Sequence, residues 1–595
     1  MENTHIYEPL KEFKNIYKER HKKNVDELFE SLVSQSKVDI KENADTIKAI
    51  NKFTEAKKNV TQKINNYSFL RGFLIIITII FLFYSIYTLT NLNESENFWL
   101  ELSLSILGIL LSILFIYLTV KKINPFIKEL KKNKDDLTKK IDEKTKLSIE
   151  QMRPLNELFN EEMPVSLFKK TIPLINLDNI FDYKRFDYLV NKFGLSDAVD
   201  LNRSTLFVKS GDINGNPFYI ANDLVHHLGT KTYTGSITIS WTTYTTINNK
   251  RVAQTRTQVL TASVNKPFPY YHEESYLVYG NEVAPLLSFS RTDSDAEHMS
   301  QKQIDKFVDR KIKKLEKKSA KSIKKGGDYT VLGHSEFEVL FGATNRDHEV
   351  QFRLLFTPLA QKQLLELMKD KVIGYGDNFD FIKRKMINII YPDHLNMIKL
   401  DGDPKNYYSN DFKEIEKNFK TYNNEYFKAI YFAFAPVLAI PLYQQHKPHE
   451  YIYKDLYPSN ASFYEHESVA NKLDINKLKN VLSSTNNILK TEVIKSADNL
   501  DEVKVTAYGY QSIPRVDYQT KMGGDGKLHT IPIHWDEYIP VFKDSTINIE
   551  VPKEETKETH TERIRNYFER LHKDKNVNQK DIRRVGKFLA VIINK

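Results

Sequence analysis

Residues 72–90 read GFLIIITIIFLFYSIYTLT, and residues 99–120 read WLELSLSILGILLSILFIYLTV. Each run has about 20 residues, which at about 1.5 Å per residue lets a helix cross a hydrocarbon core of about 30 Å. Glu101 is the only charged residue in either run and lies within a turn of one end. The pattern predicts a transmembrane helical hairpin. The alternative is a buried helical hairpin of a soluble protein.

Basic residues flank the two runs on their outer sides. They are Lys57, Lys58, Lys63 and Arg71 before the first run, and Lys121, Lys122, Lys128, Lys131 and Lys132 after the second. The connection at 91–98 has Glu94 and Glu96 and no basic residue. The excess of Lys and Arg on one side predicts a two-pass protein of the cell (plasma) membrane with both termini in the cytoplasm. Neither run has an internal charge pair, so we expect an anchor and not a transport pathway.

The composition narrows the classes of chemistry. The chain has 595 residues, a formal net charge of +10 and no cysteine. Disulfides, thiolate metal sites and cysteine nucleophiles are therefore excluded, and the composition fits reducing cytoplasm. A chain of this length predicts two to four folding units.

The polar remainder predicts an α+β fold, with an N-terminal helical stalk, the two-helix transmembrane hairpin and then a mixed antiparallel-sheet cytoplasmic domain. The stalk would form if the helical patterns before and after the hairpin pair as an antiparallel coiled coil; otherwise each arm would pack separately on the soluble part. The expected divisions are a cytoplasmic helical arm (1–68), the hairpin (69–120, with spans 72–90 and 99–120), a return arm (121–165), an α+β cytoplasmic domain (166–400), a second α+β region (401–552) and a C-terminal helical pair (553–595).

Strand patterns are clearest at 235–246 and 251–264, where β-branched residues alternate around the turn 247–250. This pattern predicts a β-hairpin. Further strands are expected in pairs around turns at 211–216 and 522–526, and others are expected singly. They cover 205–208, 217–220, 503–510, 531–539, 336–341 and 350–358. The run 429–443 predicts a buried strand or core segment, because it is too short to span a membrane.

The order of the segments resembles an uncharacterised bacterial family of two-span membrane proteins, with longer relatives in wall-less, AT-rich, mycoplasma-like bacteria. The similar residues are an F-E-x-x-F segment and a Thr-Pro pair before a helix at 359–369. They are Phe337, Glu338, Phe341, Thr357 and Pro358. The resemblance covers roughly residues 60–400 and implies that both motifs lie on strands. It implies no catalytic residue.

Residues 301–325 predict a basic amphipathic helix, with Ile304, Phe307, Val308, Ile312 and Leu315 on one face. On an anchored protein this helix would lie on anionic lipid headgroups. The expected contacts are Lys311, Lys313, Lys314, Lys317, Lys318, Lys321, Lys324 and Lys325. The alternative is a solvated helix that packs on the domain through its apolar face. No specific nucleic-acid binding is expected, because no fold motif for it accompanies the charge.

The sequence has no phosphate loop, nucleophile elbow or zincin helix. The nearest approach to a metal site is His446 and His449, with Glu465, His466 and Glu467 further on, but Pro448 between the two histidines opposes a regular helix. His226 and His227 are adjacent on an expected strand and would point to opposite faces. We therefore assign no metal, no cofactor and no catalytic residue.

These patterns favour a membrane-anchored cytoplasmic scaffold or protein-interaction module. The expected partners are the lipid bilayer, other proteins, anionic headgroups and a second copy of the chain. One alternative is a membrane-tethered enzyme with a site in 166–550. Another is a subunit of an oligomeric channel or transporter, because one hairpin cannot enclose a pore.

Overall fold

The computed structural model describes residues 5–90, 98–178, 181–196, 198–247, 250–447, 463–497, 499–550, 565, 567–569, 571 and 581–593. The chain divides into two compact units. The first unit contains residues 1–25, 161–403 and 423–595, and the second contains 26–160 and 404–422. Long N-terminal helices followed by antiparallel sheets confirm the α+β class.

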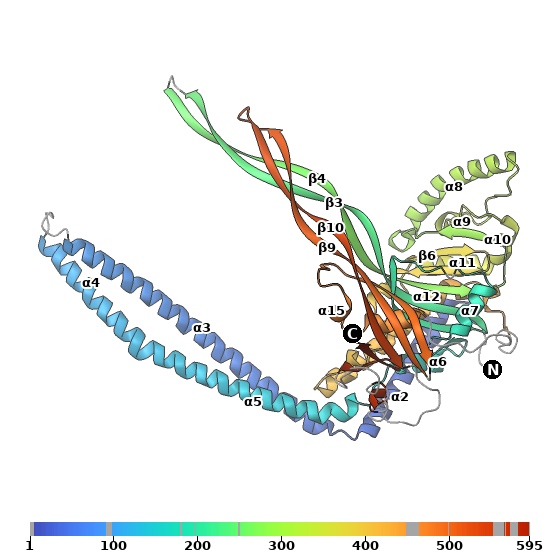
Figure 1. Cartoon of the computed structure of the whole chain (residues 1–595), viewed down its shortest axis with the longest axis horizontal. Helices are drawn as coiled ribbons and strands as arrows, with labels where there is room; N and C mark the ends of the chain where they lie inside the picture. The colour runs from blue at the N-terminus through green and yellow to red at the C-terminus, as the bar shows by residue number, and fades with distance from the viewer. Residues whose placement is uncertain are drawn as a thin grey trace. The chain divides into compact units, whose positions relative to one another are not determined.

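The second unit is built on a long helical hairpin (Figure 1). Helix α3 (Ile40–Thr90) packs along α4 (Phe98–Leu118), along the π-helical turn η3 (Thr119–Ile123) and along α5 (Asn124–Asn156). Polar contacts join the ends of α3 and α5, where Gln151 donates to the hydroxyl of Thr46 at 3.2 Å. Residues 40–68 therefore pair with the return arm as expected for the stalk, whereas residues 1–25 belong to the first unit, where Phe13 packs on Phe427.

The apolar parts of α3 and α4 approach each other through small residues. A Cβ on Gly108 would lie 2.3 Å from the Ser85 hydroxyl oxygen, and the Thr88 and Ser105 hydroxyls are 2.5 Å apart. Glycine and serine allow this close approach of helix backbones. Ser105 and Gly108 thus serve the pairing of helices within the chain.

Two helices of the described chain are long and apolar enough to cross a membrane. Their apolar side chains mostly point outward: Phe83 is 74% exposed, Trp99 80% and Ile79 60%. The core helices of a soluble protein bury such side chains. The exposure favours the transmembrane interpretation over the buried hairpin.

The first unit contains a seven-stranded antiparallel sheet with the order β1-β2-β3-β4-β7-β6-β5. Its strands are β1 (Ile175–Leu177), β2 (Arg203–Ile213), β3 (Asn216–Ile247), β4 (Lys250–Gly280), β5 (Ser288–Arg291), β6 (Phe379–Arg384) and β7 (Ile387–Pro392). The hairpins β2–β3 and β3–β4 confirm the strand pairs expected from the sequence.

The first unit also contains a five-stranded antiparallel sheet with the order β11-β12-β10-β9-β8. Its strands are β8 (Ile488–Ala497), β9 (Leu500–Met522), β10 (Leu528–Glu550), β11 (Arg583–Val585) and β12 (Phe588–Ile593). The hairpin β9–β10 turns at the expected glycine-rich loop.

The other helices of the chain lie partly in the first unit and partly in the second. They are α1 (Pro9–Glu12), the π-helical η1 (Phe13–Tyr17), α2 (Lys18–Ser36), α6 (Met163–Thr171), α7 (Tyr183–Asn191), α8 (Gln301–Lys324), α9 (Ser335–Phe341), α10 (Glu349–Leu355), α11 (Pro358–Met368), α12 (Phe412–Leu438), α14 (Phe463–Asn471) and α15 (Ile475–Leu478). Short 3₁₀ turns are η4 (Ala296–His298), η5 (Asp393–Met397), η6 (Pro404–Asn406) and η7 (Pro441–Gln444). The division between the units falls after Val25 in α2 and before Asn423 in α12. The run 429–443 is a core segment as expected, and it is helical.

Two strands expected from the sequence are helices. Residues 336–341 lie in α9, which ends at Gly342 in a left-handed conformation (φ 71°), and residues 350–355 lie in α10. Neither motif of the family resemblance therefore lies on a strand: F-E-x-x-F is in α9, and Thr357 caps α11 by accepting from the Ala360 backbone N–H. The run in α9 is buried from Phe337 to Phe341, so it has no period to distinguish helix from strand. In α10 the apolar residues Val350 and Leu354 are exposed while Phe352 and Leu355 are buried, so apolar character alone does not mark the buried face.

The prediction of a C-terminal helical pair is also wrong for the residues of this segment that form β11 and β12. Residues 583–593 form β11 and β12, which pair with each other around a turn at Gly586 (φ 59°), and β12 pairs with β10. The sequence FLAVII at 588–593 is rich in apolar and β-branched residues, which suit a strand buried by its neighbours. Most of the first expected helix of this pair lies outside the described residues.

Candidate functional site

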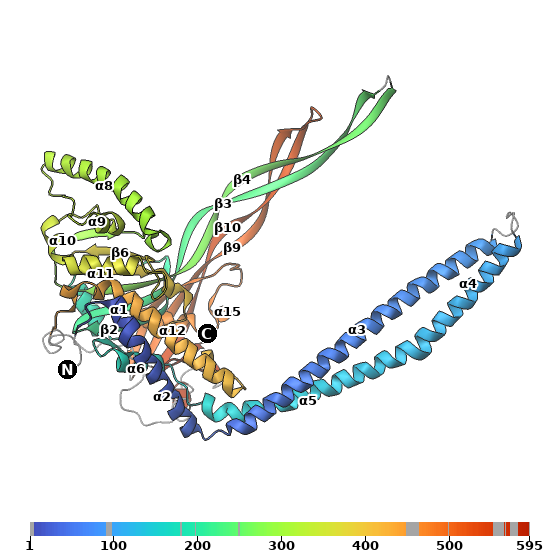
Figure 2. The same cartoon turned by 180° about the vertical axis from the view of Figure 1, so that it is seen from behind.

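Two long β-ribbons leave the sheets of the first unit and lie side by side (Figures 1 and 2). Strand β3 pairs with β2 only as far as Val225, and β4 pairs with β7 only as far as Leu277. Beyond these points β3 and β4 pair only with each other, without a bulge, to the pair Ile247–Lys250. We call residues 226–247 and 250–276 the first ribbon.

The second ribbon consists of residues 509–522 of β9 and 528–545 of β10, beyond their pairing with β8 and β12. Its tip contacts the first ribbon at Gln258, which accepts from the Gly524 backbone N–H at 2.7 Å. The first ribbon continues past this point (Figure 2). Together the two ribbons form a two-layer structure that we call the β-arm.

Apolar side chains hold the two ribbons face to face. This inner cluster consists of Ile239, Leu260, Ala262, Ile531 and Ile533, and all five are buried. Gly235 lies against the second ribbon so closely that a Cβ there would be 2.1 Å from the Pro532 carbonyl oxygen. The odd-numbered positions of β3 thus face the inner layer, as strand alternation requires.

Polar contacts lock the edges of the inner layer. The Lys266 ammonium lies 2.7 Å from the Asp517 carboxylate and 4.1 Å from the Trp535 ring centroid. The Trp535 indole N–H donates to the same carboxylate at 2.9 Å. Lys266 therefore ties β4 to both strands of the second ribbon.

The outer face of the first ribbon is a ladder of Thr and Ser side chains, interrupted only at Val259. Cross-strand neighbours on this face are Thr234 with Ser263, Ser236 with Thr261, Thr238 with Val259, Ser240 with Thr257, and Thr242 with Thr255. All ten side chains are exposed. The ladder is uncharged and continuous in its strand pairing, which suits contact with a protein surface better than it suits catalysis.

The basic helix expected from the sequence is α8. Its apolar face packs on the domain, with Ile304 and Val308 buried, and its eight candidate lipid-contact lysines are all exposed. Lys318 donates to the Thr344 carbonyl and lies 4.9 Å from the Tyr329 ring centroid. The structure thus brings the predicted lysines to the surface of one helix, and it uses Lys318 partly for packing.

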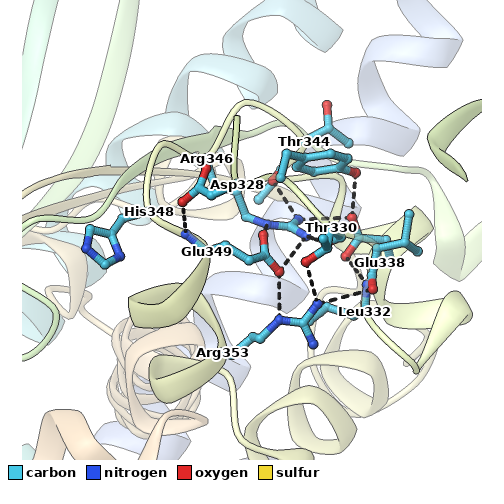
Figure 3. Close-up of polar contacts among 12 residues, drawn as sticks. Asp328, Thr330, Leu332, Glu338, Thr344, Arg346, His348, Glu349 and Arg353 are labelled. Carbon is cyan, nitrogen blue, oxygen red and sulfur yellow. Dashed lines mark hydrogen bonds and ion pairs between the residues drawn. The ribbon is translucent and has the colours of Figure 1, made fainter. Parts of the chain in front are cut away.

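The segment that follows α8 is fastened by a buried guanidinium (Figure 3). Arg346 forms ion pairs with Glu338 at 2.9 Å and Glu349 at 2.7 Å, and it donates to the Thr330 carbonyl at 2.7 Å. The Tyr329 hydroxyl donates to Glu338 at 2.8 Å. Burial opposes the charge of Arg346, but the two carboxylates outweigh it and raise the guanidinium pKa. These groups are paired with one another and serve to hold α8 in place.

Titratable groups also converge on a small cavity among β2, α14 and the β11–β12 turn. The cavity is lined by Glu161, Glu162, Lys209, Asp401, Glu465, Lys472 and Lys587, among others. Burial lowers the pKa of Lys209 to about 8 against the opposing effect of Glu465 and Glu161, and burial raises the pKa of Glu161. An amine with such a pKa can exchange a proton near neutral pH.

The size of this cavity restricts what it can bind. Its volume is about 80 Å³, whereas small-molecule sites measure about 300–1,000 Å³. Glu162 and Lys587 form an ion pair at 2.6 Å at its rim. A wider surface hollow of about 340 Å³ lies beside Lys11 and Glu366, which pair at 3.8 Å. Neither place combines a substrate-sized cleft with an activated nucleophile.

The histidine pairs do not form a metal site in the described chain. Glu465, His466 and Glu467 are buried in α14, where His466 bonds to Asp501 at 3.1 Å, and His449 lies outside the described residues. The His226 ring lies tilted against Tyr271 and Tyr510, whereas His227 stacks on Tyr270 and contacts His272 edge to face. Among the described residues, no group of three or more metal-ligating side chains converges.

The fold therefore defines an α+β chain with a helical hairpin able to span a membrane and a projecting two-layer β-arm. Comparison with protein-family models, curated proteins and solved structures finds no match for this chain. Its function must be argued from its own residues.

Proposed function

We propose that this chain is a membrane-anchored scaffold whose β-arm binds other proteins in the cytoplasm. The observation that supports the proposal is the outer face of the first ribbon, an exposed and uncharged ladder that continues beyond the second ribbon. Interfaces between proteins are depleted in charge at their centres. The helical hairpin would hold this surface at the membrane, with both termini in the cytoplasm.

The alternative class, a membrane-tethered enzyme, has less support. Catalytic sites place a nucleophile or base in a cleft large enough for the substrate. The cavity beside Lys209 joins several titratable groups but holds only about 80 Å³. A transporter subunit has less support still, because the two spans carry no charged residue except Glu101 at one end.

The test is chemical crosslinking in native membranes, followed by mass spectrometry of the proteins bound to the full chain. In the first variant an Asn-Gly turn replaces residues 243–254. The new turn joins Thr242 to Thr255, which are cross-strand neighbours in the wild-type ribbon. A variant that carries three lysines on the outer face (Thr234→Lys, Thr238→Lys, Ser240→Lys) keeps the ribbon length and adds charge. We expect both to lose the same crosslinked proteins. An unchanged set of crosslinked proteins in both variants would overturn the proposal.

We propose in addition that α8 contacts anionic lipid, because its lysines are exposed while its apolar face is already packed. Each lysine near an anionic surface contributes about 1 kcal/mol. The test compares hydrogen exchange of residues 301–325 in the full chain in nanodiscs of neutral or anionic lipid. We expect slower exchange in the anionic discs at low salt and none of this slowing at high salt.

The matched variant reverses Lys313, Lys314, Lys317 and Lys321 to Glu and spares Lys318, whose ammonium is bonded to Thr344. It should abolish the slowing. A control that reverses four lysines on the stalk (Lys131, Lys132, Lys139, Lys140) should leave it. Equal exchange of α8 in neutral and anionic discs would refute the lipid contact.

A further inference from the structure

The free edges of the β-arm differ in how they are protected. Pro267 and Pro269 of β4 lie opposite Thr230 and Leu228 of β3. Proline has no N–H, so a proline inside a ribbon occupies positions whose backbone points away from the paired strand. Because the β3–β4 register never shifts, the same alternation continues, and the even-numbered residues of β3 direct their N–H and C=O groups to the open edge.

Hydrogen bonds at both edges agree with this assignment. On the β3 side, the His226 N–H donates outward to the Asn202 carbonyl at 2.8 Å. On the β4 side, the carbonyls of Thr261 and Ser263, opposite Ser236 and Thr234, accept from side chains of the second ribbon. The outward direction of these backbone groups is therefore established at both edges of the ribbon.

Three of the four ribbon edges carry prolines or long polar side chains along part of their length. The β4 edge has its two prolines, and it has Lys521 and Gln519 of β9 on its carbonyls. The edges of the second ribbon carry Pro514 on β9 and Pro532 and Pro540 on β10. Prolines and long polar side chains are the usual protection of a sheet edge against pairing with another chain.

The β3 edge has no such protection. Residues 228–246 contain no proline and only one charged residue, Lys231. The Thr230 carbonyl accepts from the Tyr270 hydroxyl at 3.3 Å, so the open stretch begins at Thr232 and extends to Tyr244. A long, exposed and uncharged strand edge is a template for another strand.

We propose that the β3 edge pairs with the β3 edge of a second copy of this chain, in an antiparallel four-stranded sheet β4-β3-β3-β4. The inference rests on the proposed function of the β-arm and names one of its partners. A two-fold axis at Thr238 places residue 232 of one copy opposite residue 244 of the other. Seven outward-facing residues per copy then exchange about 14 hydrogen bonds.

Three features of the arm favour a second copy over another peptide. The pairing is isologous, so a single self-complementary edge supplies both sides. The hydroxyl ladder continues across the new pair, where Thr234 lies opposite Thr242 and Ser236 opposite Ser240, and such hydroxyl neighbours are favourable. The two Lys231 side chains lie opposite Thr245 of the other copy, about 46 Å apart along the strands, so they do not repel each other.

The second ribbon leaves room for this partner. Its β9 strand reaches the β4 edge through Lys521 and Gln519, whereas the ladder on the outer face of β3 is exposed. The two-fold axis is perpendicular to the ribbon, so the second ribbons of both copies lie on the same face and on opposite outer edges. The open β3 edges are the ones that meet.

The absence of cysteine allows a clean test on the full chain in nanodiscs and in detergent. A single Thr238→Cys substitution puts two thiols on the two-fold axis, at a Cα separation of about 5.5 Å that a disulfide can bridge. The matched control is Thr257→Cys, which is exposed on the same face but on the outer strand β4. We expect at least a tenfold higher yield of crosslinked dimer for Thr238→Cys than for Thr257→Cys.

Proline substitution tests the edge itself. Ser236→Pro with Ser240→Pro removes two outward N–H groups without breaking a bond inside the ribbon, as the native prolines do, and should convert the dimer into a monomer. Thr257→Pro removes an outward N–H group on the opposite edge of the ribbon. It should leave the measured molecular mass of the particle at that of two chains. Hydrogen exchange of residues 250–276 checks that the ribbon persists in each variant.

Three outcomes would overturn the inference: a monomeric wild-type chain, equal crosslinking of the two cysteine variants, or a dimer that survives the double proline substitution. These outcomes are separate from the proposed function. A monomer that keeps its arm-dependent crosslinks to other proteins overturns the dimer alone. The opposite result separates the two in the other direction. If the wild-type chain is a dimer, but its crosslinks to other proteins survive both the removal of residues 243–254 and the added outer-face lysines, the dimer is supported and the wider scaffold role is overturned.

Discussion

The stacking of the two ribbons depends on Ile533, which is fully buried in the inner cluster with Ile239 and Leu260. Replacing Ile533 by Ala removes three carbon groups, worth about 2.4 kcal/mol of transfer free energy at about 0.8 kcal/mol each. The cavity left behind raises the cost to about 3 kcal/mol. We expect the ribbons to separate more often while the body of the first unit stays folded.

Hydrogen exchange of the full chain in detergent measures this opening directly. A loss of about 3 kcal/mol increases the exchange rate of amides protected by stacking about 100-fold, if they exchange by local opening. The control is Val259→Ala, which removes a 59% exposed side chain from the outer face and should change exchange by less than about threefold. Equal effects of Ile533→Ala and Val259→Ala would refute the stacking energetics.

Other predictions concern the body of the first unit and the close approach of the ribbons. Burial lowers the pKa of His21 and of His394 to about 4 from an ordinary 6.5, so the unfolded chain binds protons that the folded chain refuses. The stability contributed by the two neutral histidines is therefore full above pH 6.5 and falls as the pH drops toward 4, by up to about 3 kcal/mol per histidine. The melting temperatures at pH 7.5 and pH 5 should differ less for the His21→Gln, His394→Gln variant than for the wild-type chain. An equal difference in the two chains would contradict the assignment. Glu338→Ala removes one of the two carboxylates that pair with the buried Arg346 and should cost about 1.5–3 kcal/mol, because Glu349 still pairs with the guanidinium. The surface pair variant Arg515→Ala should cost less than about 1 kcal/mol, and equal losses in melting temperature would contradict the prediction. Gly235→Ala places a methyl against a carbonyl oxygen and should change Trp535 fluorescence, and an unchanged spectrum would show that the ribbons are not so close.

Local patterns in the sequence are sufficient for the helical hairpin and for the long strands β2, β3, β4, β9 and β10, but they gave no signal for the short strands β1, β5, β6 and β7 or for β8. The runs 72–90 and 99–120 meet the length and apolarity that a membrane requires, and that criterion needs no knowledge of distant residues. The same holds for the β3–β4 and β9–β10 turns, where alternation and turn residues lie within one segment. The basic helix at 301–325 is equally local, since its charged and apolar faces follow one period.

The errors arose where the deciding contacts are distant. Phe337 and Phe341 lie in a short run that is buried on every side, so no period distinguishes a strand from α9. Residues 588–593 are a strand because β10 pairs with them, about 40 residues away. The resemblance to a two-span family placed its motifs on strands for the same reason, because it relied on short local signals.

The sequence by itself determined the two apolar helices long enough to span a membrane, the hydroxyl-rich strands and the exposed lysines, because each depends on spacing within a few turns or a few residues. Only the tertiary structure decided that Ile239 meets Ile533, nearly 300 residues further along the chain, and hence that two ribbons form one arm. It also decided that Lys521 and Gln519 cover the β4 edge while the β3 edge stays open. Which backbone edge is covered depends on a neighbour that no local period describes, and the proposed pairing of two copies follows from that difference.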